Sequence, residues 1–200
     1  MMLYSAPDPA PNPRRVKLFL RDKGLELPIT DLSLMQGEHR SPETLARNAR
    51  GQVPFLELDD GRVIAETVAI CRYLDELHPE PPMFGINAFE RAETDMWIRR
   101  VETGLGAAVS GFWIHGHKYT SRLIKQIPEY AELSKTRVDE TMHWIDTQLQ
   151  GRTWLAGGRY SMADIVLLSM VDFGGWIGLP IPEDAKALRN WHERATARYA

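Results

Sequence analysis

The chain has 200 residues, with 24 lysines and arginines against 27 aspartates and glutamates and a net charge of −3. This length has room for one large domain or two small ones, and the charge balance gives no global electrostatic case for nucleic acid or an acidic membrane surface as a partner. The single cysteine, Cys71, excludes an intramolecular disulfide, a C-x-x-C redox motif and a cysteine-rich zinc site.

No targeting or membrane signal is recognisable. The first 13 residues lack a basic segment and a long apolar stretch, and they carry four prolines, so they do not form a secretory signal peptide. The most apolar run, IVLLSMV at 165–171, is far shorter than the roughly 20 residues that a membrane-spanning helix needs. We therefore expect a cytoplasmic protein.

The composition changes along the chain. All six tryptophans lie between Trp97 and Trp191. The segment HPEPPMFG (78–85) separates them from the first part of the chain, and proline-dense polar segments of this kind suit linkers. We expect one domain at 1–78, a linker at 79–88 and a second domain at 89–200.

The first part alternates between strands and helices. A short apolar strand is expected at 2–4, then a helix over 14–24 with Asn12 as its N-cap and Pro13 as its first residue. A second strand is expected within 25–34.

The next segments carry turn and helix signals. Ser41-Pro42-Glu43 opens a short helix, and two apolar runs within 54–65, joined around Asp60-Gly61, predict a hairpin. Apolar residues spaced i, i+3, i+4 and i+7 from Ile70 to Leu77 predict an amphipathic helix. The resulting order, βαβ, helix, ββ, helix, is a thioredoxin-like α/β layout.

The second part reads as helical throughout. A long helix from about residue 89 carries apolar residues on one face, at Ile98, Val101, Leu105, Ala108 and Phe112. A second helix carries Val138, Met142, Ile145 and Leu149 and ends at Gly151. Ser161 and Asp164 resemble a capping box in front of 165–171. A last helix is expected to start near Pro182 and to carry Leu188 and Trp191. We expect an all-helical bundle.

Nearly the whole chain resembles the glutathione S-transferase superfamily, in a bacterial, theta-like or related class. Four segments carry this resemblance: PNPRRVKLFLRDKG (11–24), GEHRSPETLARNARGQVPFLELDDG (37–61), ETVAICRYL (66–74) and RYSMADIVLLS (159–169). Their order and spacing across two domains make the fold assignment specific. The resemblance implies glutathione as co-substrate, a small hydrophobic electrophile as second substrate, and a homodimer.

The resemblance also implies where glutathione binds. The family has a cis peptide at the position of Val53-Pro54, which turns the backbone of Val53 outward to pair with a bound peptide. Glu66-Thr67 matches the family's Glu-Ser pair at a helix N-terminus, where the γ-glutamyl carboxylate binds and Glu66 receives the ammonium. The alternative for Thr67 is that it only caps the helix.

Two further positions match weaker parts of the pattern. Theta-like classes carry a histidine in a Gly-x-His stretch that matches His39, where it reaches the glycine carboxylate of glutathione. Gln52 precedes the cis-proline pair, at a position where Lys or Gln commonly contributes to binding. The alternative for His39 is a simply solvated loop histidine.

The chain departs from its relatives at the residue that activates the thiol. A transferase must hold glutathione as the thiolate, which is the nucleophile. Related sequences place Ser or Thr six residues before the helix valine, and this chain has Ala10 there. We consider Asn12 first and Ser5 second as substitutes; Tyr4 and the backbone N–H groups of the first helix are further alternatives.

Several other residues invite a functional reading. Trp113, His115 and Tyr119 follow the long helix that lines the electrophile pocket in the family, although core packing explains aromatic residues there equally well. His115 and His117 are spaced i, i+2 and would point to different helix faces, so we expect no metal site. We expect Cys71 to be a small buried hydrophobe and Asp164 to be structural.

Three functions compete. The first is a transferase that joins the glutathione thiolate to small hydrophobic electrophiles. The second is a thiol-exchange, lyase or peroxidase enzyme that uses the same cofactor site. The third is a non-catalytic binding module with the transferase fold, for which Ala10 argues and against which the nearly complete glutathione motif argues.

Overall fold

The computed structural model describes all residues, 1–200, and the chain divides into two compact units, residues 1–83 and 84–200. The division falls inside the proline-rich segment at 78–85. None of the helices is both long enough and apolar enough to cross a membrane.

The first unit contains four strands and three α-helices. In chain order these are β1 (Met2–Ser5), α1 (Pro11–Lys23), β2 (Ile29–Asp31), the 3-10 turn η1 (Glu38–Arg40), α2 (Pro42–Arg47), β3 (Phe55–Glu57), β4 (Val63–Ala65) and α3 (Thr67–Leu77). The expected α/β order is therefore confirmed.

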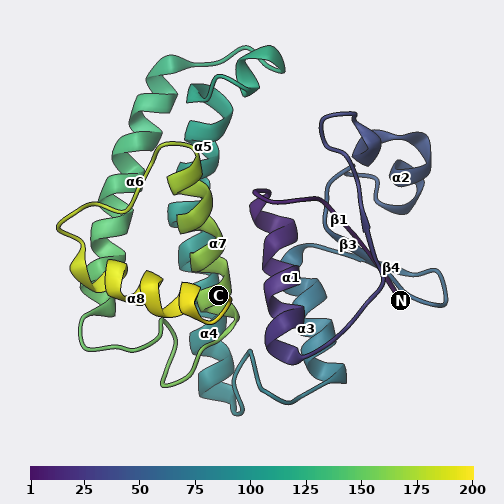
Figure 1. Ribbon diagram of the computed structural model, residues 1–200, viewed down its shortest axis with the longest axis horizontal. Helices are drawn as coiled ribbons and strands as arrows, with labels where there is room; N and C mark the ends of the chain where they lie inside the picture. The colour runs from purple at the N-terminus through teal and green to yellow at the C-terminus, as the bar shows by residue number, and fades with distance from the viewer. The chain divides into compact units, whose positions relative to one another are not determined.

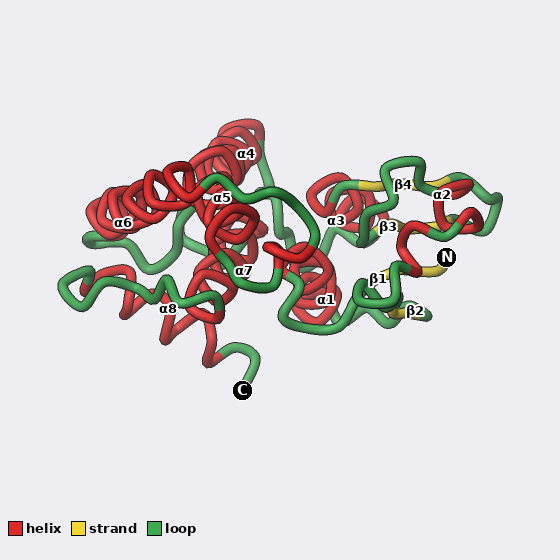
Figure 2. The backbone as a smooth tube through the Cα atoms, turned by 90° about the horizontal axis from the view of Figure 1, so that it is seen from above, coloured by secondary structure: helices red, strands yellow, loops and turns green.

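The four strands form one mixed sheet in the order β2-β1-β3-β4. β1 runs parallel to β2 and antiparallel to β3, and β3 runs antiparallel to β4. Leu3 of β1 and Leu56 of β3 lie opposite one another and are fully buried. Helices α1 and α3 pack against one another on one side of this sheet (Figures 1 and 2).

Helix α1 begins earlier than expected. Its N-cap is Ala10, which makes no side-chain capping bond, and Pro11 is its first residue. The prediction that Asn12 caps this helix is wrong, because a proline already fixes a helical φ one position before it. Gly24 ends the helix in the left-handed conformation, with φ of 62°.

The later elements of the first unit follow their local signals. Ser41 caps α2, and its hydroxyl accepts a hydrogen bond from the Thr44 N–H. Gly61, with φ of 82°, lies in the turn between β3 and β4. In α3, Ile70 and Leu74 are fully buried, whereas Leu77 at the helix end is exposed.

The second unit consists of helices. They are α4 (Ala88–Val101), the π-helical segment η2 (Glu102–Gly106), α5 (Ala107–Gly116), the 3-10 turn η3 (Thr120–Arg122), α6 (Pro128–Leu149), α7 (Met162–Trp176) and α8 (Lys186–Ala197). The expected all-helical second part is confirmed.

The long helix predicted from about residue 89 is interrupted by η2. A π-helical turn inserts extra chain into the helical repeat and so rotates the residues after it. Ile98, Val101, Leu105 and Ala108 are buried as expected. Phe112, which follows the interruption, is only half-buried, so its assignment to the buried face is wrong.

Helices α6 and α7 match their predictions, and α8 does not match its predicted start. The four apolar residues of α6 are buried, and Asp164 accepts hydrogen bonds from the backbone N–H and hydroxyl of Ser161, at 3.0 and 3.1 Å. Helix α8 begins at Lys186 rather than near Pro182. Pro182 instead lies in a turn, where its carbonyl accepts from the Ala185 N–H.

Candidate functional site

Strand register brings three separate chain segments to one edge of the sheet. Tyr4 of β1 lies opposite Phe55 of β3, and Phe55 lies opposite Ala65 of β4. Ser5 follows Tyr4, the Val53-Pro54 pair precedes Phe55, and Glu66 follows Ala65. Residues far apart in sequence therefore meet at the same edge of the first unit.

The Val53-Pro54 peptide bond is cis, as expected. The backbone N–H and C=O of Val53 make no hydrogen bond within the chain, so both are free to pair with a bound peptide. The loop before them is held by Asn48, whose side-chain amide donates to the Gln52 carbonyl at 2.8 Å. Gly51 has φ of 57°, and a side chain there would meet the His39 carbonyl oxygen at 3.1 Å.

The N-terminus of α3 presents free hydrogen-bond donors. Glu66, not Thr67, is the N-cap, and it makes no side-chain capping bond. The first intrahelical bond runs from the Ile70 N–H to the Glu66 carbonyl, so the three N–H groups before Ile70 have no partner in the helix. The reading of Thr67 as the cap is wrong. Its hydroxyl makes no hydrogen bond within the chain and adds a fourth donor.

His39 and Gln52 lie on neighbouring segments. His39 is half-buried in η1, and its Nδ1 atom is buried without a hydrogen-bond partner. Burial, with a smaller contribution from the Arg40 charge, lowers the pKa of His39, so its imidazole is neutral at pH 7. Gln52 is exposed, and its side-chain oxygen accepts from Arg50 Nε at 3.1 Å.

The start of α1 offers few donors. Pro11 and Pro13 have no N–H, and the Arg14 N–H already donates to the Ala10 carbonyl at 3.2 Å. The backbone alternative for thiolate stabilisation therefore reduces to the N–H of Asn12 alone. The Asn12 side chain is exposed and makes no hydrogen bond within the chain, so both of its amides are available.

Of the two hydroxyl candidates for thiol activation on β1, Ser5 is enclosed and Tyr4 already makes a hydrogen bond. Ser5 has no exposed surface, and its Oγ has no partner, so in this conformation it cannot touch a bound ligand. The Tyr4 hydroxyl donates to Glu57 Oε2 at 3.0 Å. Burial and this bond raise the pKa of Tyr4, which is the wrong direction for a proton donor to a thiol.

Aromatic residues gather at one end of the helical unit. The Trp113 ring lies 4.6 Å from His117, 5.7 Å from Tyr119 and 5.4 Å from Phe173, measured between ring centroids. Trp176 of α7 completes the group at 5.8 Å from Trp113 and is 55% exposed. Trp113 and Tyr119 thus belong to one aromatic cluster.

His115 does not belong to this cluster. Its Nδ1 accepts from the Ile127 N–H at 3.3 Å, and its ring packs edge-on against Tyr130 of α6. Sequence reasoning missed His117, Phe173 and Trp176. The spacing of His117 four residues after Trp113 was the available signal, because it places both rings on one helix face.

Cys71 is fully buried, as expected, and burial raises the pKa of its thiol well above its ordinary value. It therefore has the character of a packing residue and not of a nucleophile. No group of three or more His, Cys, Asp and Glu side chains is placed to hold a metal ion.

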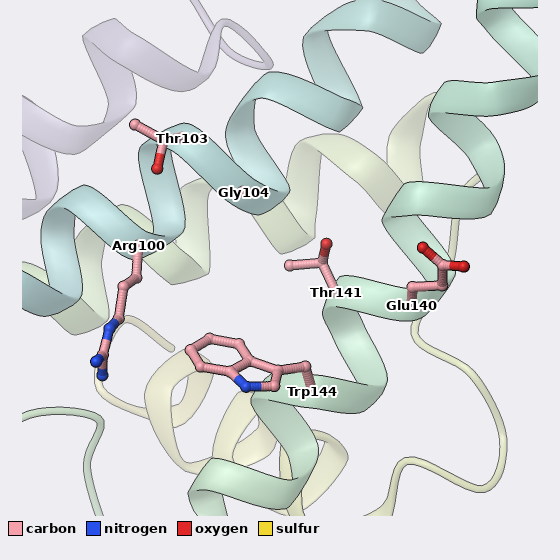
Figure 3. A pocket seen from close by; sticks show the side chains of 6 residues that line it. All are labelled: Arg100, Thr103, Gly104, Glu140, Thr141 and Trp144. Atoms are coloured by element: carbon pink, nitrogen blue, oxygen red, sulfur yellow. The ribbon is translucent and has the colours of Figure 1, made fainter.

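A hollow of about 350 Å³ lies between α4 and α6 in the second unit. It is lined by Arg100, Thr103, Gly104, Glu140, Thr141 and Trp144. Figure 3 shows Arg100 and the Trp144 indole pointing toward one another from the two helices. The Arg100 guanidinium lies 4.9 Å from the Trp97 ring and 5.8 Å from that of Trp144, both within the range of cation–π attraction.

Comparison with known proteins identifies the family. The model of the glutathione S-transferase N-terminal domain matches residues 10–77, and that of the C-terminal domain matches 108–198. Glutathione S-transferase 2 of Saccharomyces cerevisiae is 35% identical over 99% of this chain and 86% of its own length. The chain belongs to the glutathione S-transferase family. It is a glutathione transferase enzyme, and the resemblance found in its sequence is confirmed.

Two further matches extend the comparison, and the name of the first does not mention glutathione. FtsZ-localized protein A of Caulobacter vibrioides is 33% identical over 94% of this chain and 83% of its own. A crystal structure of a glutathione S-transferase domain-containing protein from Marinobacter aquaeolei matches with a TM-score of 0.92 and 32% identity. That match covers 99% of this chain and 98% of the other.

Proposed function

We propose that this glutathione transferase joins the glutathione thiolate to the electrophilic carbon of small hydrophobic substrates. The observation that carries the proposal is the convergence at one sheet edge of an unpaired Val53 backbone and an α3 N-terminus with free donors. These groups match the two parts of a γ-glutamyl tripeptide, an extended backbone and a terminal carboxylate.

Each group takes a defined part of glutathione. The Val53 N–H and C=O pair with the cysteinyl backbone, as in strand addition. The γ-glutamyl carboxylate binds the Thr67 hydroxyl and the free N–H groups of α3, where the helix dipole favours an anion. Glu66 receives the ammonium. His39 and Gln52 act as hydrogen-bond donors to the glycine carboxylate, through the imidazole N–H of His39 and the side-chain amide of Gln52.

Asn12 is the group that we assign to the sulfur. A free thiol with a pKa near ~8.5 is mostly protonated at neutral pH, so a donor that favours the thiolate is needed. Asn12 keeps both a side-chain amide and a backbone N–H without a partner, whereas Ser5 is enclosed and Tyr4 donates to Glu57. The thiol proton passes to solvent, and the thiolate supplies the electron pair of the new carbon–sulfur bond.

The aromatic cluster of the second unit is the surface that we assign to the electrophile. We assign Trp113 and Tyr119 to the electrophile pocket, as expected from the sequence, and add His117, Phe173 and Trp176. We do not assign His115 to this surface, because its ring packs against Tyr130 of α6. Flat apolar rings suit an aryl substrate, which stacks on Trp176.

Retention on immobilised glutathione, followed by an assay with chlorodinitrobenzene, tests the proposal. We expect retention and turnover with release of chloride.

Thr67→Val removes the hydroxyl but keeps the side-chain volume, and it should raise KM for glutathione more than it lowers kcat. Thr196→Val, at an exposed position of α8, is the matched control. Absence of both retention and turnover at millimolar glutathione would overturn the proposal, and faster turnover of hydroxyethyl disulfide than of the aryl substrate would reassign the enzyme to thiol exchange.

A further inference from the structure

In the connection between α5 and α6, residues 117–127, two uncharged polar side chains turn inward. Thr120 is buried, and its hydroxyl lies 2.7 Å from the Trp113 carbonyl and 2.8 Å from that of His117. The side-chain amide of Gln126 donates to the same His117 carbonyl at 2.8 Å and to the Ile114 carbonyl at 3.3 Å. Two polar side chains therefore satisfy the last carbonyls of α5 and brace the connection from within. We call residues 117–127 the tip.

The aliphatic side chains of the tip point outward. Leu123 is 67% exposed, Ile124 42% and Ile127 51%. Ile114, in the last turn of α5 beside the tip, is 40% exposed. A connection in water ordinarily exposes polar residues and buries aliphatic ones. The exposure of four aliphatic side chains on and beside one connection indicates an apolar environment outside the chain.

The tip is also positively charged. Lys118, Arg122 and Lys125 are exposed, and none of them forms an ion pair within the chain. No acidic residue lies between Glu102 and Glu129. Some other cations of the chain are paired, for example Lys17 with Asp31 and Lys23 with Asp75. Unpaired cations beside exposed aliphatic side chains match an anionic lipid surface, where headgroups attract the charges and acyl chains accept the aliphatic groups.

The shape of the tip favours lipid over a protein partner. Figure 1 shows the tip as the outer end of the hairpin formed by α5 and α6, where the chain turns back on itself. A stable protein interface needs about 800 Å² on each side and close shape complementarity, which eleven residues at the end of a hairpin do not provide. A fluid lipid surface accepts a protruding tip without complementarity.

We propose that residues 117–127 dock this enzyme reversibly on anionic lipid surfaces, through Leu123, Ile124 and Ile127 with Lys118, Arg122 and Lys125. The proposal concerns a surface contact and no membrane-spanning segment. It also departs from the expectation, based on the net charge of −3, that the chain has no membrane partner. The net charge of the whole chain does not describe a local segment that has no acidic residue.

Sedimentation with vesicles tests the proposal. We expect the enzyme to bind vesicles of phosphatidylcholine with roughly 30% phosphatidylglycerol, an anionic lipid, at low salt. It should bind pure phosphatidylcholine far more weakly. Lys118→Gln, Arg122→Gln and Lys125→Gln together should weaken binding by roughly a hundredfold, since each cation near the surface contributes about one kcal/mol. Leu123→Ser with Ile124→Ser should weaken it at least about tenfold.

Two matched controls should leave vesicle binding unchanged. Lys135→Gln, Arg137→Gln and Lys186→Gln remove three exposed cations outside the tip, and Leu77→Ser removes an exposed aliphatic side chain of the first unit. Equal loss in the charge control and in the tip variant would show that total charge, not the tip, drives binding. That result would overturn the proposal, as would wild-type enzyme that stays in the supernatant with anionic vesicles.

A labelled variant gives a second test that needs no loss of function. Cys71 is fully buried, so Leu123→Cys can be labelled selectively with an environment-sensitive fluorophore. We expect a blue shift of its emission with anionic vesicles and none for a label at Leu77→Cys. Emission that does not change at the tip, or that changes equally at both positions, contradicts insertion of the tip into the lipid surface.

Discussion

At the scale of single residues, Glu66 combines an unfavourable backbone conformation with a position in the proposed glutathione site. It is the one non-glycine residue of the chain with positive φ, 69°, and its ψ is 123°. A non-glycine residue in this region costs about 1–3 kcal/mol and persists where the surroundings require it. The requirement here is the turn from β4 into α3, which aims the free N–H groups of α3 at the site proposed for glutathione.

Two substitutions at Glu66 separate strain from binding. Glu66→Ala removes the carboxylate but keeps the Cβ, so we expect a higher KM for glutathione and little change in the free energy of unfolding. Glu66→Gly removes both, and it should be about 1 kcal/mol more stable than Glu66→Ala while binding glutathione as poorly. Urea unfolding and steady-state kinetics measure the two effects. A glycine variant less stable than the alanine variant would show that the backbone is not strained.

The assignment of Asn12 leads to a prediction that depends on pH. Asn12→Ala should lower kcat/KM about tenfold to a hundredfold near neutral pH, because a hydrogen bond to a charged group contributes about 1.5–3 kcal/mol. The loss should shrink as the pH rises past ~8.5, where the free thiol ionises without help. The pH profile of kcat/KM measures this. Ser5→Ala is the control, and an equal loss in that variant would mean that the enclosed serine becomes exposed during catalysis.

At the scale of elements, local sequence signals explain most of the fold, but they fail at the starts of α1 and α8 and at the interruption of the long helix. The Ser41 cap, the turn at Gly61 and the apolar spacing of α3 and α6 act within a few residues, so the sequence alone predicts them. Two prolines and one asparagine compete for the first turn of α1, so local signals do not determine where this helix starts. The π-helical segment at 102–106 carries no local signal and depends on packing against neighbouring helices.

The site at the sheet edge was predicted only through family resemblance. Each segment carries its own motif, but the meeting of Ser5, Pro54 and Glu66 depends on strand register, which no single segment determines. Likewise, the aromatic cluster needs Phe173 and Trp176 from α7, far from Trp113 in sequence. Pairings between distant segments are the part of this molecule that residue patterns do not show.

Asp164 joins three segments of the helical unit. Its carboxylate accepts from the Leu155 N–H at 2.8 Å, from the Ser161 N–H at 3.0 Å and from Trp191 Nε1 at 2.9 Å. Burial outweighs these bonds and raises the pKa of Asp164 to about 6.

We expect Asp164→Asn to lower the free energy of unfolding by about 3 kcal/mol, because an amide turns a donor toward groups that are themselves donors. Urea unfolding at fixed pH measures it. Glu193→Gln on exposed α8 is the control, and a loss no larger than in this control would contradict the role of Asp164 as an anchor.

His143 ties α6 to the turn before α8 in a manner that depends on pH. Its Nδ1 lies 2.9 Å from the Asp139 carbonyl oxygen and its Nε2 lies 3.1 Å from Asp184 Oδ1. The hydrogen bond to the Asp139 carbonyl, followed by that to Asp184, raises the pKa of His143 above 6.5. The stabilisation is therefore complete below pH 6.5 and is lost as the pH rises through the raised pKa.

The pH dependence of Tm between 6 and 8 tests this contact. Wild-type enzyme should lose Tm across this range relative to His143→Gln, in which the contact does not titrate. Asp184→Asn should flatten the profile as well, since it removes one of the two partners. Parallel profiles for wild type and both variants would show that the contact does not contribute to stability.

At the scale of the whole molecule, opposite charges lie unpaired on one face of the helical unit. Arg100 and Glu140 both line the hollow between α4 and α6, on either side of Trp144, and neither forms an ion pair with the other. In a two-fold interface the same patch meets itself, so opposite charges on one patch can pair across the axis, Arg100 of one copy with Glu140 of the other. Trp144, 40% exposed at the centre of the hollow, supplies the apolar surface. If the chain forms the homodimer that the family resemblance implies, we predict that this face is its interface.

Charge reversal tests this dimer. Sedimentation equilibrium of the wild type should give twice the chain mass of 22.8 kDa. Arg100→Glu should weaken the dimer, since it sets like charges against one another, and adding Glu140→Arg should restore it by reversing both signs. Trp144→Asp should weaken it irrespective of those charges, whereas Trp176→Asp, at another exposed tryptophan, should leave the mass unchanged. The second reversal removes the like-charge repulsion that the first creates across the two-fold axis. A double variant that dimerises as weakly as Arg100→Glu alone would therefore locate the interface on a different face.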